Sequence, residues 1–237
     1  MKLSVVIPAY NEEKYLPGCL ESLKNQTFRD FEIIVIDNNS TDTTAEIAMQ
    51  HGVNIIHEAK KGVGAARKKG FSQARGEIIV STDADCTFPP DWLEKIAHAF
   101  ENPNTIAVYG TTIIEDPSIW KRQLSYYVMN IFYQINDRLN KKQFQGSNSA
   151  VRKTAYEKTT GYDSSLGALE DADLCKKLMK IATPSAIFFD PSIKIITSAR
   201  RLKNGNFLKS LWTYLTWYYQ TWWKQSSKKI QTVEDIR

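Results

Sequence analysis

Two carboxylates in residues 77–90, EIIVSTDADCTFPP, offer the clearest chemistry in the chain. Asp83 and Asp85 follow a short run of β-branched residues, which is typical of a strand buried on both faces. An i, i+2 spacing in extended backbone places both side chains on one face, and α/β sheets bind ligands at the carboxyl ends of their strands. A divalent cation, Mn²⁺ or Mg²⁺, with a phosphate would offset the repulsion between the carboxylates. The alternative is a solvated D-x-D turn, and this stretch alone leaves both interpretations open.

Two further charged residues stand where an anionic ligand could bind. Asp37 ends a predicted strand at the same edge and could accept hydrogen bonds from a nucleobase or a ribose. Its spacing favours the simpler alternative, an Asx-turn that helps Ser40 begin the next helix. Arg67 replaces the third glycine of a dinucleotide fingerprint after Gly62-x-Gly64, so that fingerprint is absent. Arg67 is either an anion clamp at a helix N-terminus or part of a solvated face.

A second acidic pair, Glu170-Asp171, lies at the predicted start of a helix. Acidic residues there often serve only to match the helix dipole. A general base is the functional alternative, and adjacent residues point in different directions, so both roles can hold. His51, His57 and His98 have no metal-ligand spacing, and we interpret them as surface or core residues.

The composition describes an ordinary globular protein of 237 residues, with 42% hydrophobic and 24% charged residues. The net charge of +5 suits an anionic ligand or an anionic membrane surface and is too small to indicate nucleic acid. Three widely spaced cysteines (Cys19, Cys86 and Cys175) are typical of reduced thiols in a cytoplasmic protein. The first residues predict a strand rather than a signal peptide, and no apolar window is long enough to span a bilayer.

The elements that must position these residues alternate regularly. Strands are predicted at 3–7, 31–36, 53–57 and 78–80, with helices between them that Asn11 and Ser40 would cap. This alternation predicts an α/β fold with a doubly wound, mostly parallel central sheet flanked by helices. Further helices are expected at 92–100, 119–139 and 170–180, and strands at 106–114, 186–189 and 194–197. We expect one domain at 1–202, followed by a separate tail.

The remaining residues, 203–237, are predicted to form an aromatic, basic tail with an amphipathic helix at 207–224. Four of the six tryptophans lie between residues 212 and 223, with lysines around them. Tryptophan and lysine favour the headgroup level of an anionic bilayer, so we hypothesise a peripheral position on the cytoplasmic face of a membrane. The apolar stripe of helix 119–139 could share that surface. Packing on the catalytic domain or on a second copy is the alternative.

Six motifs together resemble, in order and spacing, the family 2 glycosyltransferases with the GT-A fold. They are VVIPAYNEE (5–13), DNNSTD (37–42), GVGAARKKG (62–70), STDADC (81–86), GSNSAVRK (146–153) and GYDSSLGALEDADL (161–174). The resemblance covers roughly residues 3–200. It implies that residues 1–202 form a catalytic domain, with a nucleotide-binding half at about 1–115 and an acceptor half at about 116–202. It also implies transfer of a sugar from a UDP- or GDP-sugar, with inversion, to a hydroxyl or phosphate of an acceptor such as a glycan. The aromatic, basic tail suggests that this acceptor is lipid-linked.

The resemblance also implies roles for individual residues. The nucleotide and its diphosphate would be held by Pro8, Tyr10, Glu12, Asp37, Asp83, Arg67, Arg200 and Arg201. The divalent metal would bind Asp85 with Asp83 beside it. The sugar and acceptor site would contain Gly146, Ser147, Asn148 and Glu170. Asp171 would be the base.

The motif Q-x-x-R-W of processive polysaccharide synthases is missing, and Ser198-Ala199-Arg200-Arg201 stands roughly in its place. We therefore do not expect a processive polymerase. Two other functions compete with transfer. A sugar nucleotidyltransferase normally has a basic, glycine-rich loop after the first strand, where this chain has Pro-Ala-Tyr-Asn-Glu-Glu. A non-catalytic nucleotide-sugar-binding partner subunit need not keep both Asp85 and Asp171.

Overall fold

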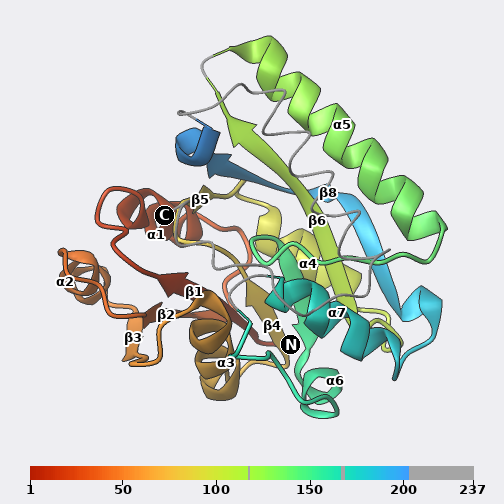
Figure 1. Ribbon diagram of the computed structural model, residues 1–237, viewed down its shortest axis with the longest axis horizontal. Helices are drawn as coiled ribbons and strands as arrows, with labels where there is room; N and C mark the ends of the chain where they lie inside the picture. The colour runs from red at the N-terminus through yellow and green to blue at the C-terminus, as the bar shows by residue number, and fades with distance from the viewer. Residues whose placement is uncertain (117, 167–168, 203–237) are drawn as a thin grey trace.

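The computed structural model describes residues 1–116, 118–166 and 169–202, with side chains up to residue 200 (Figure 1). Its elements up to residue 87 are β1 (Leu3–Ala9), α1 (Leu16–Lys24), β2 (Phe31–Asp37), α2 (Thr44–Gln50), β3 (Asn54–His57), α3 (Val63–Gln73), β4 (Ile78–Ser81) and β5 (Cys86–Thr87). The later elements are α4 (Trp92–Ala99), β6 (Ala107–Glu115), α5 (Ile119–Arg138), β7 (Ser149–Arg152), α6 (Lys153–Glu157), α7 (Glu170–Met179), the 3₁₀-helix η1 (Pro184–Ala186), β8 (Ile187–Ser198) and the 3₁₀-helix η2 (Ala199–Leu202).

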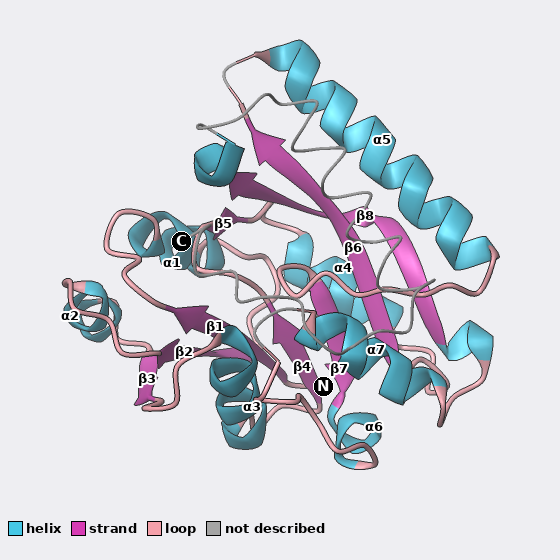
Figure 2. Ribbon diagram, viewed as in Figure 1, coloured by secondary structure: helices cyan, strands magenta, loops and turns pink. Residues whose placement is uncertain are grey.

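One sheet with the order β3-β2-β1-β4-β7-β6-β8-β5 runs through the whole described domain (Figure 2). β1 pairs in parallel with β2 and β4, and β2 pairs in parallel with β3. β-Branched residues dominate these strands because both faces are covered: Val5 packs into the core with α1 and α4, and Val6 packs into the core with α3 and α7. The predicted α/β fold is confirmed.

The second half of the sheet is mixed. β7 is antiparallel to both β4 and β6, whereas β8 is parallel to β6 and antiparallel to β5. The prediction of two short strands near 186–189 and 194–197 is wrong, because they form the single strand β8. The register moves from Tyr109–Phe189 to Thr111–Lys194, so the break that separates the two apolar runs is a bulge within one strand.

Two predicted helix caps are also wrong. α1 begins at Leu16 and α2 at Thr44, several residues after Asn11 and Ser40. Asn11 adopts a left-handed backbone with φ of 54°, accepts a hydrogen bond from the Thr41 N–H at 2.8 Å and donates its own N–H to Ser40 Oγ at 3.1 Å. These residues therefore join the loop after β1 to the loop after β2.

Helix α5 lies along one edge of the molecule and follows β6 and β8 (Figure 1). Its buried residues are Ser125, Met129 and Tyr133, and the Tyr133 ring packs against those of Tyr109 and Phe189, with centroids 6.0 and 5.5 Å away. The longer apolar stripe that runs from Trp120 to Leu139 lies on the exposed side. The helix is where the pattern predicts it, and its most apolar face is turned away from the sheet.

The contact between α3 and β1 gives a test of the fold. A Cβ atom added to Gly70 would overlap Val6 Cγ1, so we expect Gly70→Ala to lower the free energy of unfolding by about 1–3 kcal/mol. Gly18→Ala in α1 is the matched control, because the nearest atom to its added Cβ is 4.0 Å away and alanine is the better helix former by about 1 kcal/mol. Urea denaturation followed by circular dichroism measures both changes. Unchanged stability of Gly70→Ala would contradict this close packing.

Candidate functional site

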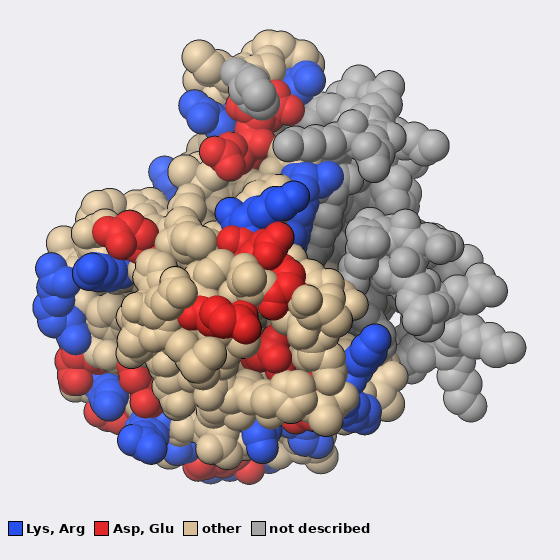
Figure 3. Space-filling view, turned by 90° about the vertical axis from the view of Figure 1, so that its left-hand side faces the viewer, with Lys and Arg blue, Asp and Glu red and all other residues tan. Residues whose placement is uncertain are grey.

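The loops that follow β1, β2 and β4 meet at the carboxyl edge of the sheet. Ala9 and Asp37 are register partners, and the Thr82 N–H donates to the Val6 carbonyl at 3.2 Å. Figure 3 shows the side of the molecule toward which β1 and β2 point in Figure 1. Acidic side chains gather in the middle of this side, with basic side chains beside them. Four predicted site residues therefore lie at the carboxyl edge of the sheet, namely Glu12, Asp37, Asp83 and Asp85.

Asp83 and Asp85 do not lie in extended backbone. The prediction that strand geometry places both side chains on one face is therefore wrong. They occupy a turn between β4 and β5, in which the Cys86 N–H donates to the Asp83 carbonyl at 3.3 Å. Each carboxylate faces its own guanidinium. Asp83 Oδ1 accepts from Arg67 Nη2 at 2.7 Å, and Asp85 Oδ2 lies 3.2 Å from Arg200 Nε.

Arg67 is nearly fully buried, with 4% of its surface exposed, so the solvated-face interpretation is wrong. Its guanidinium bridges Asp83 at the end of β4 and Glu170 at the start of α7. It also packs against the backbone of Gly146, where an added Cβ would overlap it. The Arg67 Nε has no hydrogen-bond partner among the described residues. A charged donor is therefore aimed into the site and held by carboxylates.

Glu170 and Asp171 have separate partners, as adjacent residues at a helix start should. Glu170 pairs with Arg67, whereas Asp171 Oδ2 accepts the Gly146 N–H at 2.7 Å and Oδ1 accepts the Ala172 N–H at 2.8 Å. Burial raises the pKa of Asp171, and Arg67 opposes that shift. A carboxylate with a raised pKa is a stronger base near neutral pH, which suits a general base.

Arg200 reaches the same edge from the end of β8. Its guanidinium binds both carboxylate oxygens of Glu12, contacts Asp85 and lies over the Tyr15 ring, 4.9 Å from its centroid. Burial raises the pKa of Glu12, and the hydrogen bond from Arg200 opposes that shift. The side chain of Arg201 lies outside the described residues.

The predicted nucleotide end of the site is more open. Pro8 and Tyr10 are partly exposed at the end of β1, and Asp37 is buried nearby. Asp37 Oδ1 accepts the Ser40 N–H at 3.1 Å, which is the expected Asx-turn, while Oδ2 lies 3.2 Å from Nδ1 of His57. His57 was not among the predicted site residues. The only local signal was its place at the end of the next strand.

The 146–148 segment is divided between the site and the core. Gly146 lies against Arg67 and Asp171, and Ser147 is partly exposed. Asn148 departs from its expected place in the sugar site, because it is fully buried. Its amide donates to the carbonyls of Thr111 and Ile193 and accepts from Trp92 Nε1, at 2.9–3.0 Å. It therefore ties β7 to β6, β8 and α4.

The donor set fits a metal that arrives with its substrate. Aspartate oxygens suit Mn²⁺ or Mg²⁺, and Mg²⁺ commonly binds one or two carboxylates and completes its shell with phosphates and waters. Within the described ranges, no group of three histidine, cysteine or acidic side chains could hold a metal ion. The carboxylates of Asp85 and Asp83 have the oxygen ligands that such a cation prefers.

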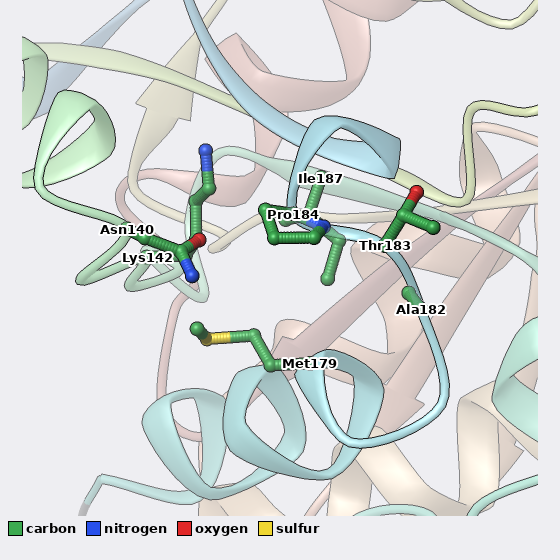
Figure 4. Close-up of a pocket in the computed structure, with 7 residues that line it drawn as sticks. All are labelled: Asn140, Lys142, Met179, Ala182, Thr183, Pro184 and Ile187. Atoms are coloured by element: carbon green, nitrogen blue, oxygen red, sulfur yellow. The ribbon is translucent and has the colours of Figure 1, made fainter.

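A small pocket elsewhere is unrelated to this edge. It has a volume of about 20 Å³, room for about one water molecule, and lies at the end of α7 between Met179, Lys142 and Pro184 (Figure 4). It contains none of the predicted site residues.

Comparison with known proteins defines the class. The sequence profile of Glycosyl transferase family 2 matches residues 4–160, and the chain belongs to this family. It is 39% identical over 99 residues to the putative glycosyltransferase EpsH of Bacillus subtilis, covering 40% of this chain and 29% of that protein. It is 35% identical over 114 residues to the dolichol-phosphate mannosyltransferase of Pyrococcus furiosus, covering 46% and 32%. Each match thus spans about a third of the relative.

Among solved structures, the chain is similar to the mannosyltransferase PcManGT of Pyrobaculum calidifontis in complex with GDP-Man and Mn²⁺. The TM-score is 0.69 at 20% identity, and the match covers 82% of this chain and 56% of that one. This likeness shows a shared GT-A fold.

The charge balance around Arg67 predicts a pH dependence of stability. Burial raises the pKa of Glu170 from 4.5 to about 7, despite the opposing charge of Arg67. Between these values the native state holds a proton that the unfolded chain has lost, so stability should fall as the pH rises, by at most about 1.4 kcal/mol per pH unit. Glu170→Gln removes this titration and should flatten the profile from pH 4.5 to 7.

Urea denaturation at several pH values measures the effect, and Glu157→Gln on the exposed surface of α6 is the control. A Glu170→Gln profile that is as steep as that of the unsubstituted protein would contradict the assignment.

Proposed function

We propose that this chain is an inverting, metal-dependent glycosyltransferase that uses a UDP- or GDP-sugar as donor. The observation that carries the proposal is the convergence of Asp85, Asp83, Arg67 and Asp171 at one sheet edge, together with membership of family 2. The PcManGT structure with GDP-Man and Mn²⁺ supports the choice of donor and metal class.

The donor would lie across the ends of β1, β2 and β4. Asp37 with Pro8 and Tyr10 would contact the nucleoside, and Asp85 with Asp83 would hold the metal. Such a metal, when bound, neutralises the diphosphate leaving group as a Lewis acid. Arg67 and Arg200 would place positive charge where negative charge develops.

Asp171 would take the proton from the acceptor as the acceptor attacks the far side of the sugar carbon, which inverts the anomeric centre. The Gly146 N–H and the helix start fix its carboxylate in one orientation. Gly146, Ser147 and Glu170 would line the sugar and acceptor side. Holding both reactants in line can lower the barrier by roughly 7–11 kcal/mol.

The acceptor would be a hydroxyl or phosphate of a glycan or of a lipid-linked carrier at the cytoplasmic face of a membrane. None of the described helices has both the length and the apolar content needed to cross a bilayer. The proposal rests instead on the aromatic, basic composition of 203–237, a segment outside the described residues, and on the named activity of the Pyrococcus relative.

A panel of UDP- and GDP-sugars with Mn²⁺ or Mg²⁺ tests the function. Release of nucleoside diphosphate with transfer or hydrolysis of the sugar is the expected result. A donor that raises the melting temperature without turnover would indicate the non-catalytic partner subunit, since a ligand at ~100 times its Kd stabilises by about 2.7 kcal/mol. Pyrophosphate exchange would indicate the nucleotidyltransferase.

Replacement of the proposed base gives a sharper test. Asp171→Asn keeps the size and the acceptor oxygen for Gly146 but removes the basicity, so kcat should fall by roughly 10²–10⁴ with donor affinity nearly unchanged. Asp173→Asn is the matched control, because Asp173 lies on the same helical turn and pairs with Lys177 at 2.6 Å. Loss of donor affinity with normal turnover per bound donor would make Asp171 a binding residue.

The metal role is tested at Asp85. We expect Asp85→Ala to abolish transfer and to weaken Mn²⁺ binding in the presence of UDP or GDP, as measured by titration calorimetry. The fold should survive, because Asp85 lies in a turn and Arg200 keeps Glu12 as a partner. Asp91→Ala, which removes a surface pair with Lys95, should bind Mn²⁺ normally. Full activity of Asp85→Ala in excess EDTA would exclude the metal role.

A further inference from the structure

Among the described residues, the exposed side of α5 carries most of the exposed large apolar side chains. These side chains lie on the helix or directly after it, namely Ile119, Trp120, Leu124, Tyr127, Ile131, Ile135 and Leu139. We call these seven residues the α5 face. They run the length of a helix of about 30 Å, and Trp120 and Tyr127 are each 60% exposed. Contiguous apolar patches of this kind mark interaction sites in soluble proteins.

The fold fixes which side of α5 is exposed. Met129 and Tyr133 anchor the opposite side to the rings of Tyr109 and Phe189. Asp137, the only acidic residue of α5, accepts hydrogen bonds from the Tyr109 hydroxyl and the Phe189 N–H at 3.0 Å and from Lys142 at 2.8 Å. The one carboxylate of the helix is therefore bonded to the core side.

Positive charges predominate on and beside the α5 face, although Asp116 lies 3.9 Å from Lys121 at the start of the helix. Residues 118–136 contain Lys121 and Arg122 and no aspartate or glutamate, and Arg138 follows at the other end. Residues 191–233 also contain no acidic residue, and their lysines and arginines are Lys194, Arg200, Arg201, Lys203, Lys209, Lys224, Lys228 and Lys229.

The strand β8, at the start of residues 191–233, ends beside the strand that leads to α5. Glu115 at the end of β6 is the register partner of Ser198 at the end of β8. α5 begins four residues after Glu115, and the described chain ends at Leu202, four residues after Ser198. The Ser198 N–H donates to the Asp85 carbonyl at 3.1 Å, so this corner also adjoins the candidate site.

We propose that the α5 face docks on an anionic lipid bilayer, with its apolar side chains at the headgroup level and its cations against the lipid phosphates. Tryptophan and tyrosine favour this depth, and lysine and arginine favour an anionic surface. A second copy of the chain, or residues 207–224, would bring cations against the cations of α5, whereas an anionic bilayer complements them. Docking through this face would bring the chain to a lipid-linked acceptor. Only the identity of that acceptor rests on the proposed function.

Vesicle flotation of the full chain tests the docking surface. Vesicles of phosphatidylcholine with phosphatidylglycerol, and of phosphatidylcholine alone, are compared at low and high salt without donor. We expect binding to the anionic vesicles that weakens with salt. The double variant Ile131→Glu/Ile135→Glu should reduce that binding at least about tenfold, because two apolar contacts become repulsive charges.

Met49→Glu/Ile181→Glu is the matched control, since it changes two equally exposed apolar residues that lie off α5. It should float like the unsubstituted protein. Equal flotation of the α5 variant would overturn the proposal and leave residues 203–237 as the membrane contact. A lower mass of the α5 variant by light scattering without lipid would assign the face to a second copy.

A fall in melting temperature confined to the α5 variant, with flotation unchanged, would assign the face to residues 207–224. Nucleotide release from a donor sugar in lipid-free buffer is measured in parallel. If none of these proteins releases nucleotide, the proposed sugar transfer is wrong. The flotation result still decides whether the α5 face docks on the bilayer, so the two proposals can fail separately.

Discussion

The buried guanidinium of Arg67 is the charge around which the site is assembled. It joins the end of β4 to the start of α7 through Asp83 and Glu170, which are 87 residues apart in the chain. Removing one member of such a cluster leaves an uncompensated buried charge, which costs far more than the net contribution of the intact ion pairs. The same guanidinium requires a glycine at position 146, whose N–H in turn orients Asp171. One arginine therefore holds both ends of the proposed donor and base arrangement.

Arg200 repeats this arrangement on the other side of the D-x-D turn. It gathers Glu12 and Asp85, so the two aspartates of the turn belong to two different ion-pair clusters. A metal and a diphosphate bound here, as proposed, would exchange partners with existing ion pairs, which would lower the desolvation cost of binding. Arg200 lies two residues after the end of β8, so the position of that strand determines where the guanidinium meets Asp85.

The sequence predicts the parts of this arrangement that have a local signature. Runs of β-branched residues identified β1, β2 and β4, and the residues after them lie at one edge, as the parallel topology requires. Pairings across long stretches of chain carry no such signature, and the Arg67–Glu170 and Arg200–Glu12 pairs had to come from the structure. Asn148 shows the same limit: a polar residue within a family motif is a core residue here because three distant groups satisfy its amide.

The amphipathic pattern of α5 predicts an apolar face, but it does not predict which face of the helix packs on the sheet. The packing of Tyr133 and the hydrogen bonds of Asp137 decide which face meets the sheet. The core side of α5 is held by aromatic contacts and polar anchors, which frees the more apolar side for another partner. Since β6 and β8 end as register partners, the start of α5 and the Arg200 corner are held together by the sheet itself. A surface bound along α5 would therefore lie at a fixed position relative to Asp85.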